Sequence, residues 1–480
     1  MLMDKNKLKK TKIIATLGPA CSDPAIMERM VREGVNIFRL NFSHGTHEQK
    51  AKEIKTIKEL RERLGYPIGI LADLQGPKLR IGKIKGGTVM LRDGEIIEIT
   101  NTECEGDEKR VYMSYREFAK DVKPGDAVLI DDGKIKLEVI ETNGRDTVRA
   151  RVIHGGPLSS NKGVNLPHTN ISLPSLTEKD LKDARFILEQ EVDWIALSFV
   201  RKPEDILDLH DVIKKHGGKN QPWIISKIEK PEALENLDQI IDLSKGIMIA
   251  RGDLGVEVSF SKVPIIQKEI IQKCIEQAKP VIIATQMMES MIENFRPTRA
   301  EATDVANAVL DGGDCLMLSG ETSVGKYPVE VVTNMHSIIS WTESHGFHYL
   351  REHPPTEFSP TFLPESVCYH ACKMAEQTHS EAIITFTYSG STALYIASHR
   401  PNARIFAFTP NRDLINKLAL VYNVYPFCME EVEKIEDAVQ KSVRFLKEKG
   451  LLEDNQVVVH VGSTPVNKRG KTNVLKLSYV

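Results

Sequence analysis

Eight short apolar segments, each ending in polar residues, constrain the fold of this chain more than any other feature. They read KIIATLGP, NIFRLNFSHG, IGILADLQGP, DWIALSFVRKP, WIISKIEKP, GIMIARGDLG, PVIIATQMMES and DCLMLSGET. Stretches with helical periodicity lie between them. Eight strand–helix repeats predict a closed (β/α)8 barrel, whose chemistry gathers at the C-terminal ends of its strands. An open doubly wound sheet is the competing architecture.

One interval interrupts this alternation after the third strand. From about Pro77 to Leu173 the chain has β-like stretches, TVMLRDGEIIEI, AVLIDDGKIKLEVI and TVRARVIHGG, separated by Gly and Asp turns. This pattern predicts an inserted β domain over residues 77–173, and the barrel then comprises residues 1–76 and 174–345. An insertion at this point lies over the barrel mouth, so we expect a mobile lid.

A third unit follows the proline-rich, polar segment REHPPTEFSPTFLPES. The apolar runs AIITFTYSGSTALYIASHRP, ARIFAFTP, QVVVHVG and VLKLSYV accompany helical patterns such as KIEDAVQKSVRFLKEKG. They predict a smaller C-terminal α/β domain over residues 346–480. The predicted fold class is therefore α/β, with a barrel, an inserted β lid and a C-terminal α/β domain.

The charge and cysteine content exclude several classes of function. Lys plus Arg number 64 against 66 Asp plus Glu, so no basic field marks a nucleic-acid-binding protein. The seven cysteines are scattered without a zinc-binding or CxxC pattern, which is typical of a reducing compartment. The basic N-terminus lacks an apolar signal segment, and no apolar run approaches the length of a membrane span. We therefore expect a soluble, cytoplasmic protein without a nucleic-acid or membrane partner.

An amine and two carboxylates end neighbouring predicted strands. Lys227 and Glu229 end the run WIISKIE, and Asp253 follows GIMIA. In a parallel barrel these positions meet at one rim. Two carboxylates beside one amine predict a divalent metal ion and an anionic substrate. The competing interpretation is that Lys227 and Glu229 form a surface ion pair and that Asp253 caps a helix.

Polar groups also follow the second and third predicted strands. They are Arg39, Asn41, Ser43 and His44 after the second strand, and Asp73, Lys78 and Arg80 after the third. These segments belong to a series of motifs, RLNFSHG, DLQGPKLR, SKIE, ARGDLG, ATQMMESM, RPTRAEATDVANAV and DCLMLSGET, which closely resembles the pyruvate kinase family. The resemblance covers essentially the whole chain in order. It is strongest in the barrel and weakest in the last domain.

The resemblance implies transfer of a phosphoryl group from phosphoenolpyruvate to ADP, giving pyruvate and ATP. It places Mg²⁺ or Mn²⁺ on Glu229 and Asp253, since a hard ion prefers carboxylate and phosphate oxygens. Lys227 then lies against the moving phosphoryl group and the enolate oxygen, where negative charge develops. A structural ion pair between Lys227 and Glu229 is the alternative role.

The resemblance assigns further rim residues to phosphoenolpyruvate. Backbone amides of Gly252 and Asp253 receive its carboxylate if they open a helix, and the Thr285 hydroxyl bonds the same group. A buried threonine bonded only to the backbone is the alternative for Thr285. Ser319 and Glu321 belong to a proton relay behind Thr285, or they cap the next helix.

The resemblance also assigns residues to phosphate and to the nucleotide. Arg39 and Arg80 grip phosphate as planar, permanently charged forks. An ordinary surface imidazole is the alternative for His44. The positions that approach the nucleotide are Asn41, Phe42, Ser43, His44, Arg80 and, from the lid, Lys162.

The segment DLQGPKLRI departs from the pattern of many family members. Those members have Thr and Glu where this chain has Leu74 and Lys78, and they require K⁺ beside the positions of Asn41, Ser43 and Asp73. A tethered ammonium group near the Ser43 and Asp73 oxygens makes a monovalent ion redundant. We therefore expect activity without K⁺, with Lys78 in place of the ion.

The segment Gly320–Lys326, GETSVGK, matches the first positions of a phosphate-binding P-loop. Tyr327 replaces the Ser or Thr that binds Mg²⁺ in such loops, and Pro328 follows at once. We therefore reject a P-loop at this place.

The last domain contains a candidate site for a phosphorylated effector. A turn rich in hydroxyl groups and glycine opens a predicted helix, and cationic side chains could meet it from another loop. The residues are Thr387, Ser389, Gly390, Ser391 and Thr392 in the turn, and Lys468, Arg469 and Lys471 in the loop. Family members often bind such an effector here, which implies activation by a sugar phosphate or a nucleoside monophosphate. A helix cap with solvated lysines is the alternative.

Two other function classes compete with a kinase. A metal-dependent barrel lyase acting on oxo acids would also use Glu and Asp near an arginine, but it gives no role to Lys227, the lid or the ADP-binding positions. A non-catalytic metabolite sensor would have lost a metal ligand or Lys227, and neither is missing. The resemblance further implies a homotetramer.

Overall fold

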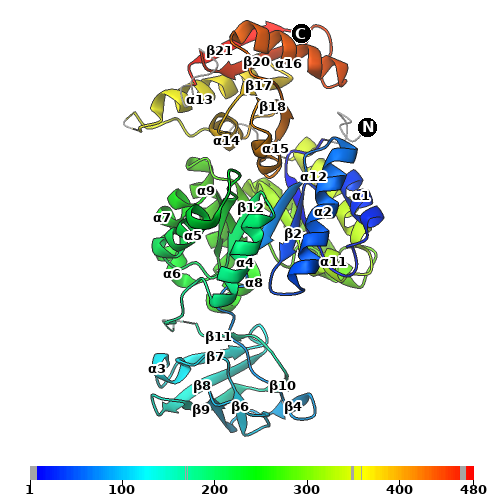
Figure 1. Ribbon diagram of the computed structural model, residues 1–480. Coiled ribbons are helices and arrows are strands. Elements are labelled where there is room, and N and C mark those ends of the chain that lie inside the picture. The colour runs from blue at the N-terminus through cyan, green and yellow to red at the C-terminus, as the bar shows by residue number, and fades with distance from the viewer. Residues whose placement is uncertain (1–7, 168, 170, 347–350, 358, 465–471) are drawn as a thin grey trace.

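The computed structural model describes residues 8–167, 169, 171–346, 351–357, 359–464 and 472–480. They form three parts in a row, with the barrel in the middle, a mostly β domain at one end and an α/β domain at the other (Figure 1).

The barrel confirms the predicted fold class. Its parallel strands are β1 (Lys12–Thr16), β2 (Ile37–Asn41), β3 (Gly69–Asp73), β12 (Trp194–Leu197), β13 (Trp223–Ile228), β14 (Gly246–Ala250), β15 (Val281–Ala284) and β16 (Cys315–Leu318). The ring closes because β1 pairs with both β2 and β16. Each strand falls within one of the eight apolar segments, and the closed ring excludes the open doubly wound sheet.

Helices surround this ring (Figure 1). They are α1 (Pro24–Glu33), α2 (His47–Leu64), α4 (Glu178–Glu189), α5 (Pro203–His216), α6 (Pro231–Glu235), α7 (Leu237–Leu243), α8 (Arg251–Glu257), α9 (Val263–Glu276), the 3-10 helix η2 (Glu289–Ile292), α10 (Arg299–Asp311), α11 (Gly320–Ser323) and α12 (Pro328–His345). Capping boxes at Thr46, Thr177 and Thr298 begin α2, α4 and α10, because each hydroxyl accepts from a backbone amide that the first turn leaves free.

Packed apolar side chains fill the interior of the barrel. Leu71, Trp194, Met248 and Ile282 from four different strands are fully buried in one cluster inside the ring. A second cluster fills the space between strands and helices. Burial on both faces explains why the strands are nearly continuous apolar runs. Few polar side chains lie within the strands, Arg39 and Ser226 among them, and the others stand at or near the strand ends.

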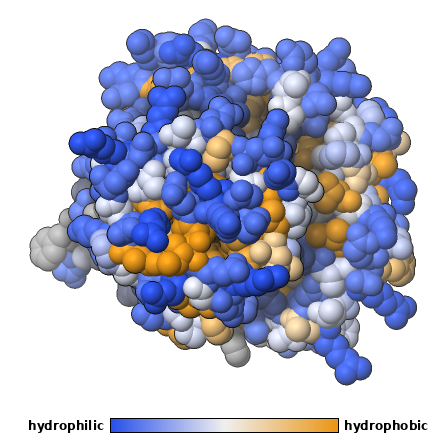
Figure 2. All heavy atoms as spheres, turned by 90° about the horizontal axis from the view of Figure 1, so that it is seen from below, coloured by the Kyte–Doolittle hydropathy of each residue, from blue (hydrophilic) through white to orange (hydrophobic). Residues whose placement is uncertain are grey.

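The lid has its own core and its own sheets. Its elements are β4 (Thr88–Leu91), β5 (Ile96–Thr100), β6 (Arg110–Tyr112), α3 (Phe118–Asp121), β7 (Ala127–Ile130), β8 (Ile135–Thr142), β9 (Thr147–His154), β10 (Gly156–Ser159) and β11 (Val164–Asn165). Six strands form one sheet in the order β11-β7-β8-β9-β5-β6, and β10 pairs with β4. Seen from this end, the surface is mostly hydrophilic with apolar patches between the charged side chains (Figure 2).

The C-terminal domain is an α/β sheet at the opposite end of the barrel (Figure 1). Its elements are α13 (Phe362–Gln377), β17 (Ala382–Phe386), α14 (Ser391–Ser398), β18 (Arg404–Thr409), α15 (Arg412–Leu418), β19 (Val424–Cys428), α16 (Ile435–Glu448), β20 (Val457–Gly462) and β21 (Val474–Tyr479). The sheet order is β19-β18-β17-β20-β21, with β21 antiparallel at one edge.

A buried ion pair joins this domain to the base of the barrel. Arg400 Nη2 lies 2.7 Å from Asp314 Oδ2, and each side chain is 2% exposed. The guanidinium group also donates to the Gly312 carbonyl and lies over the Tyr422 ring. Asp314 directly precedes β16, so the pair ties the C-terminal domain to a strand whose other end reaches the rim.

Among the described residues, no helix combines the length and the apolar character that crossing a membrane requires.

Candidate active site

A buried lysine lies at the centre of the polar rim. Lys227 lies near the end of β13, and its Nζ is 2.9 Å from Glu229 Oε1 and 3.3 Å from Oδ1 of Asp73, the last residue of β3. The same ammonium group donates to Ser198 Oγ at 2.8 Å. Its side chain is 12% exposed. The predicted ion pair between Lys227 and Glu229 is present, but it belongs to a buried network and not to the surface.

Charges of opposite sign favour the ionised forms of Lys227 and Asp73. Burial alone would lower the pKa of Lys227, but the Asp73 and Glu229 carboxylates outweigh burial and raise it above the usual lysine value. Burial opposes ionisation of Asp73 as well, but Lys227 and Arg39 lower the pKa of that carboxyl below its usual range. Lys227 is therefore a fixed cation at neutral pH.

Glu229 and Asp253 fit a divalent ion. Glu229 Oε2 accepts from the Phe199 amide at 2.8 Å, and the buried Oε1 faces Lys227 Nζ at 2.9 Å. Burial raises the pKa of Glu229, Lys227 opposes this, and the Asp253 carboxylate raises it further. A cation between the two carboxylates would relieve that repulsion.

The donor set suits magnesium more than a metal held by protein alone. No cluster of three or more His, Cys, Asp or Glu side chains that could hold a metal occurs in the described part of the chain. Mg²⁺ typically binds one or two carboxylates and takes its other oxygens from substrate phosphate and water. Glu229 and Asp253 therefore supply the two carboxylates that Mg²⁺ takes from a protein, whereas a closed structural metal site needs four protein ligands.

The backbone is strained beside these carboxylates. Thr285, directly after β15, has φ +71°, and Phe199, after β12, has φ +55°. A left-handed conformation is unfavourable for a β-branched or bulky residue and is concentrated at functional sites. The Thr285 hydroxyl accepts from the Gly252 amide at 2.7 Å and donates to the Ala284 carbonyl at 2.6 Å. Thr285 thus has the backbone bonds of its alternative role but is only partly buried, and its contact with substrate stays a prediction.

Helix α8 begins at Arg251, so Gly252 and Asp253 lie in its first turn, as the sequence suggested. A Cβ atom at Gly252 would lie 3.3 Å from Thr285 Oγ1, tighter than most contacts of that kind. Glycine therefore allows α8 and the Thr285 loop to approach each other closely.

Glu321 connects two rim loops. Its Oε2 accepts from the Ser319 amide at 2.7 Å and its Oε1 from the Met288 amide at 3.2 Å, with the residue 2% exposed. The carboxylate therefore holds the backbone after β16 against the backbone after β15. Both roles that the sequence left open, a relay and a cap, are compatible with this position.

Arg39 is aimed at the rim by two partners. Its Nε and Nη2 each lie 2.7 Å from Asp73 Oδ2, and its Nη1 donates to Thr16 Oγ1 at 3.1 Å. This side-on pair fixes the plane of the guanidinium group. Next to it, Asn41 Oδ1 accepts from the Ser43 amide at 2.9 Å and shapes the turn after β2.

The other residues expected to contact the nucleotide lie in the turn after β2 and in the lid. Arg80 Nη1 donates to the Asn161 carbonyl at 2.9 Å, and Lys162 Nζ lies 2.9 Å from Asp131 Oδ1 within the lid. Burial and the nearby cations Arg80 and Lys78 lower the pKa of His44. A neutral imidazole among cations indicates a region of positive potential that suits an anionic ligand. Phe42 is buried and its ring lies 6.2 Å from the Phe186 ring, as a support for this turn.

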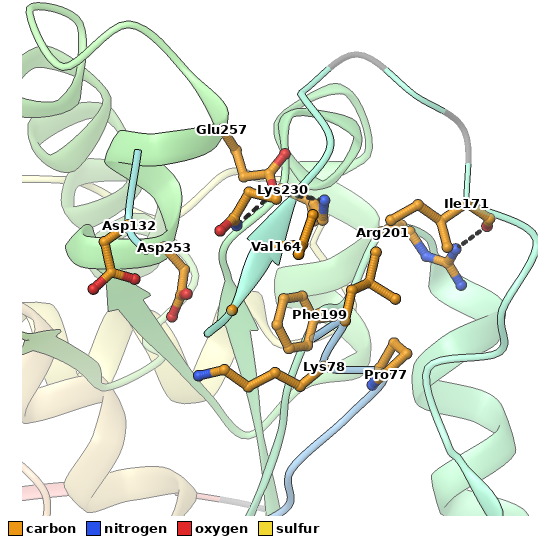
Figure 3. Close-up of a pocket in the computed structure, with 13 residues that line it drawn as sticks. Pro77, Lys78, Asp132, Val164, Ile171, Phe199, Arg201, Lys230, Asp253 and Glu257 are labelled. Carbon is orange, nitrogen blue, oxygen red and sulfur yellow. Dashed lines mark hydrogen bonds and ion pairs between the residues drawn. The ribbon is translucent and has the colours of Figure 1, made fainter. Parts of the chain in front are cut away.

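Lys78 is exposed and lines a pocket between lid and barrel (Figure 3). Its ammonium group points to the side of that pocket where Asp132 and Asp253 lie. Among the described residues, the ion-pair partners of Asp73 are Arg39 and Lys227, and Lys78 is not one of them. The replacement of K⁺ by Lys78 stays a prediction.

Several contributors were missed by the sequence analysis. Ser198 and Phe199 end the run DWIALSF, and Arg251 forms a two-point ion pair with Asp304 at 2.8 and 2.7 Å. Ser198 could have been found as the first polar residue after β12. Nothing in the sequence pairs Arg251 with Asp304, because the two side chains meet only when α8 and α10 pack around the barrel.

The rejected P-loop forms no phosphate cradle. Its first residues make the short helix α11, and the amides of Val324 and Gly325 donate to the Gly320 carbonyl. Lys326 donates its own amide to Ile292 and its ammonium group to Glu293 at the surface. The loop amides are thus used within the protein.

The predicted effector turn borders a cavity of about 330 Å³ in the C-terminal domain. Gly390, at φ +89°, ends the turn and donates its amide to Thr387 Oγ1 at 3.0 Å. Ser389 and Ser391 share a hydroxyl hydrogen bond of 3.1 Å, and Thr392 bonds the Thr472 hydroxyl at 2.9 Å. Glu430 and Glu431 also line the cavity. Lys468, Arg469 and Lys471 lie outside the described residues.

Comparisons with known proteins show the family of the chain. The family model for the pyruvate kinase barrel domain matches residues 8–332, and that for the pyruvate kinase alpha/beta domain matches residues 365–478. A pyruvate kinase from Corynebacterium glutamicum is 44% identical over 467 residues, covering 97% of each chain. One from Clostridium acetobutylicum is 40% identical over 476 residues, covering 98% of this chain and 100% of the relative. The crystal structure of a pyruvate kinase from Cryptosporidium parvum superposes with a TM-score of 0.91 at 33% identity, over 99% of this chain and 97% of the other.

Proposed function

The chain belongs to the pyruvate kinase family, and from this premise we propose that Lys227, Glu229 and Asp253 carry the transfer of a phosphoryl group from phosphoenolpyruvate to ADP. The activity is that of a pyruvate kinase, a phosphotransferase that forms pyruvate and ATP. The observation that carries the residue assignment is the Lys227 ammonium group, held among carboxylates at the C-terminal rim of the barrel. Neither the lyase nor the sensor is favoured, because the relatives that match over the full length are pyruvate kinases.

Mg²⁺, or Mn²⁺ in its place, is the cofactor that this donor set supports. When bound by Glu229 and Asp253, the ion supplies positive charge next to phosphate and enolate oxygens. Besides burial, the mutual repulsion of the Glu229 and Asp253 carboxylates raises the pKa of Glu229, which supports this assignment. The assignment also explains why two carboxylates lie close together at a site for an anionic substrate.

The chain's own residues supply position and charge. Lys227 and Arg39 neutralise the phosphoryl oxygens from fixed places, which is most of what phosphoryl transfer requires from a protein. The first amides of α8, at Gly252 and Asp253, orient the substrate carboxylate. Thr285 reaches the same group by exchanging its backbone partner for the substrate, and Ser319 and Glu321 hold the wall behind it. Asn41, Phe42, Ser43, His44, Arg80 and Lys162 form the nucleotide side.

A coupled assay tests the function directly. Purified protein with Mg²⁺, phosphoenolpyruvate and ADP should form ATP and pyruvate in equal amounts, and neither product should form when ADP is omitted. Release of pyruvate without ATP would instead indicate a lyase or a phosphatase. Absence of turnover would indicate a sensor.

Activity without K⁺ is the first prediction for this site. In Tris or sodium buffer the protein should reach full kcat, and added K⁺ should change it by less than about twofold, since the Lys78 ammonium group supplies the charge. Lys78→Glu should restore a dependence on K⁺ of about tenfold or more. Lys85→Glu, at an exposed lysine of the same segment, is the matched control and should keep the wild-type response. A many-fold activation of the wild type by K⁺ would refute the prediction.

The second prediction is activation of the enzyme by a phosphorylated ligand. We propose that the cavity beside Ser391 and Thr392 binds a sugar phosphate or a nucleoside monophosphate, supported by the free N-terminus of α14 and its hydroxyl groups. Such a ligand should lower the phosphoenolpyruvate concentration at half-saturation, and Ser391→Asp should abolish this shift through charge repulsion. Ser344→Asp adds the same charge at an exposed site on α12 and should leave the shift intact. If the saturation curve of the wild type does not move with any ligand of these two classes, the site is a helix cap only.

The third prediction is assembly of the chain into a homotetramer. Two exposed apolar positions support it, Trp341 on α12 at 68% and Tyr479 on the edge strand β21 at 79%. Sedimentation should give a mass about four times that of the chain, and Tyr479→Lys should lower it. A monomer at assay concentrations would contradict this proposal.

We further propose a cytoplasmic location, supported by seven cysteines that are all free.

A further inference from the structure

A buried carboxylate lies where the lid meets the barrel. Glu257 ends α8 and is 2% exposed, and its Oε1 accepts from Lys230 Nζ at 2.7 Å and from Asn165 Nδ2 at 2.9 Å. Lys230 follows Glu229 at the rim and is 4% exposed, whereas Asn165 belongs to lid strand β11. Figure 3 shows Glu257 and Lys230 joined above the pocket that contains Asp253. One carboxylate therefore links α8, the β13 rim and the lid.

This link is the polar contact of the lid strands with the barrel, whereas Arg201 of the barrel donates to the Ile171 and Leu173 carbonyls on the segment that leaves the lid. Within residues 88–165, all of which the structure describes, the Asn165 bond is the one hydrogen bond to a described barrel residue. The β7–β8 turn also approaches α8, since a Cβ at Gly133 would lie 3.9 Å from Val256 Cγ1 and Asp132 lines the pocket beside Asp253 (Figure 3), but no hydrogen bond joins this turn to a described residue of α8. The polar connection between the lid strands and the barrel thus depends on a single side-chain pair.

Packing alone does not explain why a carboxylate is buried at Glu257. Its Oε2 is buried without a hydrogen-bond partner among the described residues. A buried carboxylate with one oxygen unsatisfied is less favourable than an apolar side chain of similar size. The carboxylate is better explained by the contacts that it directs.

We propose that Glu257 is a positioning residue that latches the lid to α8 through Asn165. The inference rests on the proposed function, because α8 carries Asp253 and because Lys162, on the nucleotide side, lies three residues before Asn165 in the lid. With the latch made, Lys162 is held at a fixed distance from the rim. With the latch broken, the lid and Lys162 move independently of α8. The latch therefore acts on ADP, which contacts the lid, more than on phosphoenolpyruvate, which contacts the barrel.

Variants at Asn165 test the latch without removing a proposed ligand. Asn165→Ala removes the donor and should raise the KM for ADP about tenfold, with the KM for phosphoenolpyruvate and kcat changed by less than about twofold. Asn165→Asp has nearly the same shape but places a second carboxylate against Glu257, so its effect should be larger. Adding Glu257→Gln to Asn165→Asp restores one donor, one acceptor and a single negative charge beside Lys230. This double variant should recover most of the wild-type KM for ADP.

Hydrogen exchange gives a second readout that does not depend on catalysis. In the ligand-free protein, Asn165→Asp should speed amide exchange in β11 and α8 while leaving β8 and β9 unchanged, and the double variant should reverse this. Asn101→Ala is the matched control, because the Asn101 side chain donates to two carbonyls within the lid, those of Arg116 and Arg145. It should behave as wild type in both measurements.

The outcomes separate this inference from the proposed function. An inactive wild type would refute the function, and exchange would still decide whether the contact exists. An active wild type whose Asn165 variants keep the KM ratio and the exchange pattern of the Asn101→Ala control would overturn the latch. Equal increases in both KM values, with no recovery in the double variant, would also overturn it, because general loosening of the lid predicts that pattern.

Discussion

Replacing Lys227 with methionine should lower kcat by about 10³-fold or more at saturating Mg²⁺, phosphoenolpyruvate and ADP. Methionine keeps much of the volume of the side chain but removes the charge that faces the moving phosphoryl group. The substitution also leaves Asp73 and Glu229 without the ammonium group at 3.3 and 2.9 Å. The negative charge of the site then repels the substrate that it has to stabilise.

The measurement is steady-state kinetics coupled to pyruvate reduction, with circular dichroism to confirm folding. Lys58→Met is the matched control, since this lysine pairs with Glu191 on the surface and should keep kcat within about twofold. Lys227→Arg should stay far below wild type, because a planar guanidinium group cannot take the place of a compact ammonium group. A folded Lys227→Met protein with more than a tenth of the wild-type kcat would contradict the proposed role.

Replacing Asp314 with asparagine should destabilise the protein by about 3–5 kcal/mol. The two oxygens of Asp314 accept from Arg400 and from the amides of Val281 and Tyr422. Without the carboxylate, the Arg400 guanidinium group is left as an uncompensated charge in a place that is 2% exposed. The base of β16 and the C-terminal domain should loosen together.

Urea unfolding monitored by two probes measures this effect, one probe for the barrel and one for the C-terminal domain, because a chain of several domains need not unfold in one step. Asp238→Asn removes half of an exposed ion pair with Lys273 and should cost no more than about 1 kcal/mol. Adding Arg400→Met to Asp314→Asn should recover part of the loss, since it removes the stranded charge. Unchanged unfolding midpoints for Asp314→Asn would show that the pair contributes nothing to domain docking.

Much of the fold was predictable because its signal is local. All eight barrel strands fall within the apolar segments that the sequence shows, and the helices with Thr46, Thr177 and Thr298 start at ordinary capping residues. The candidate site was predictable in part for the same reason, since Lys227 and Glu229 lie at the end of one apolar run and Asp253 follows another. The contacts of Thr285 show the limit. Its left-handed backbone and its bond to Gly252 arise only when the loops after β14 and β15 pack together.

The sequence by itself determined the strands, their order and the chemistry at their ends, because a strand buried on both faces must be a continuous apolar run that stops at the first residue it cannot bury. Only the tertiary structure decided which polar groups meet. Asp73 and Lys227 stand on strands separated by β12, and closure of the ring brings them to 3.3 Å. Asn165 and Glu257, and Arg400 and Asp314, meet across domain boundaries that no local pattern encodes. Such pairs depend on the docking of separate cores, and their partners are therefore visible only in the assembled molecule.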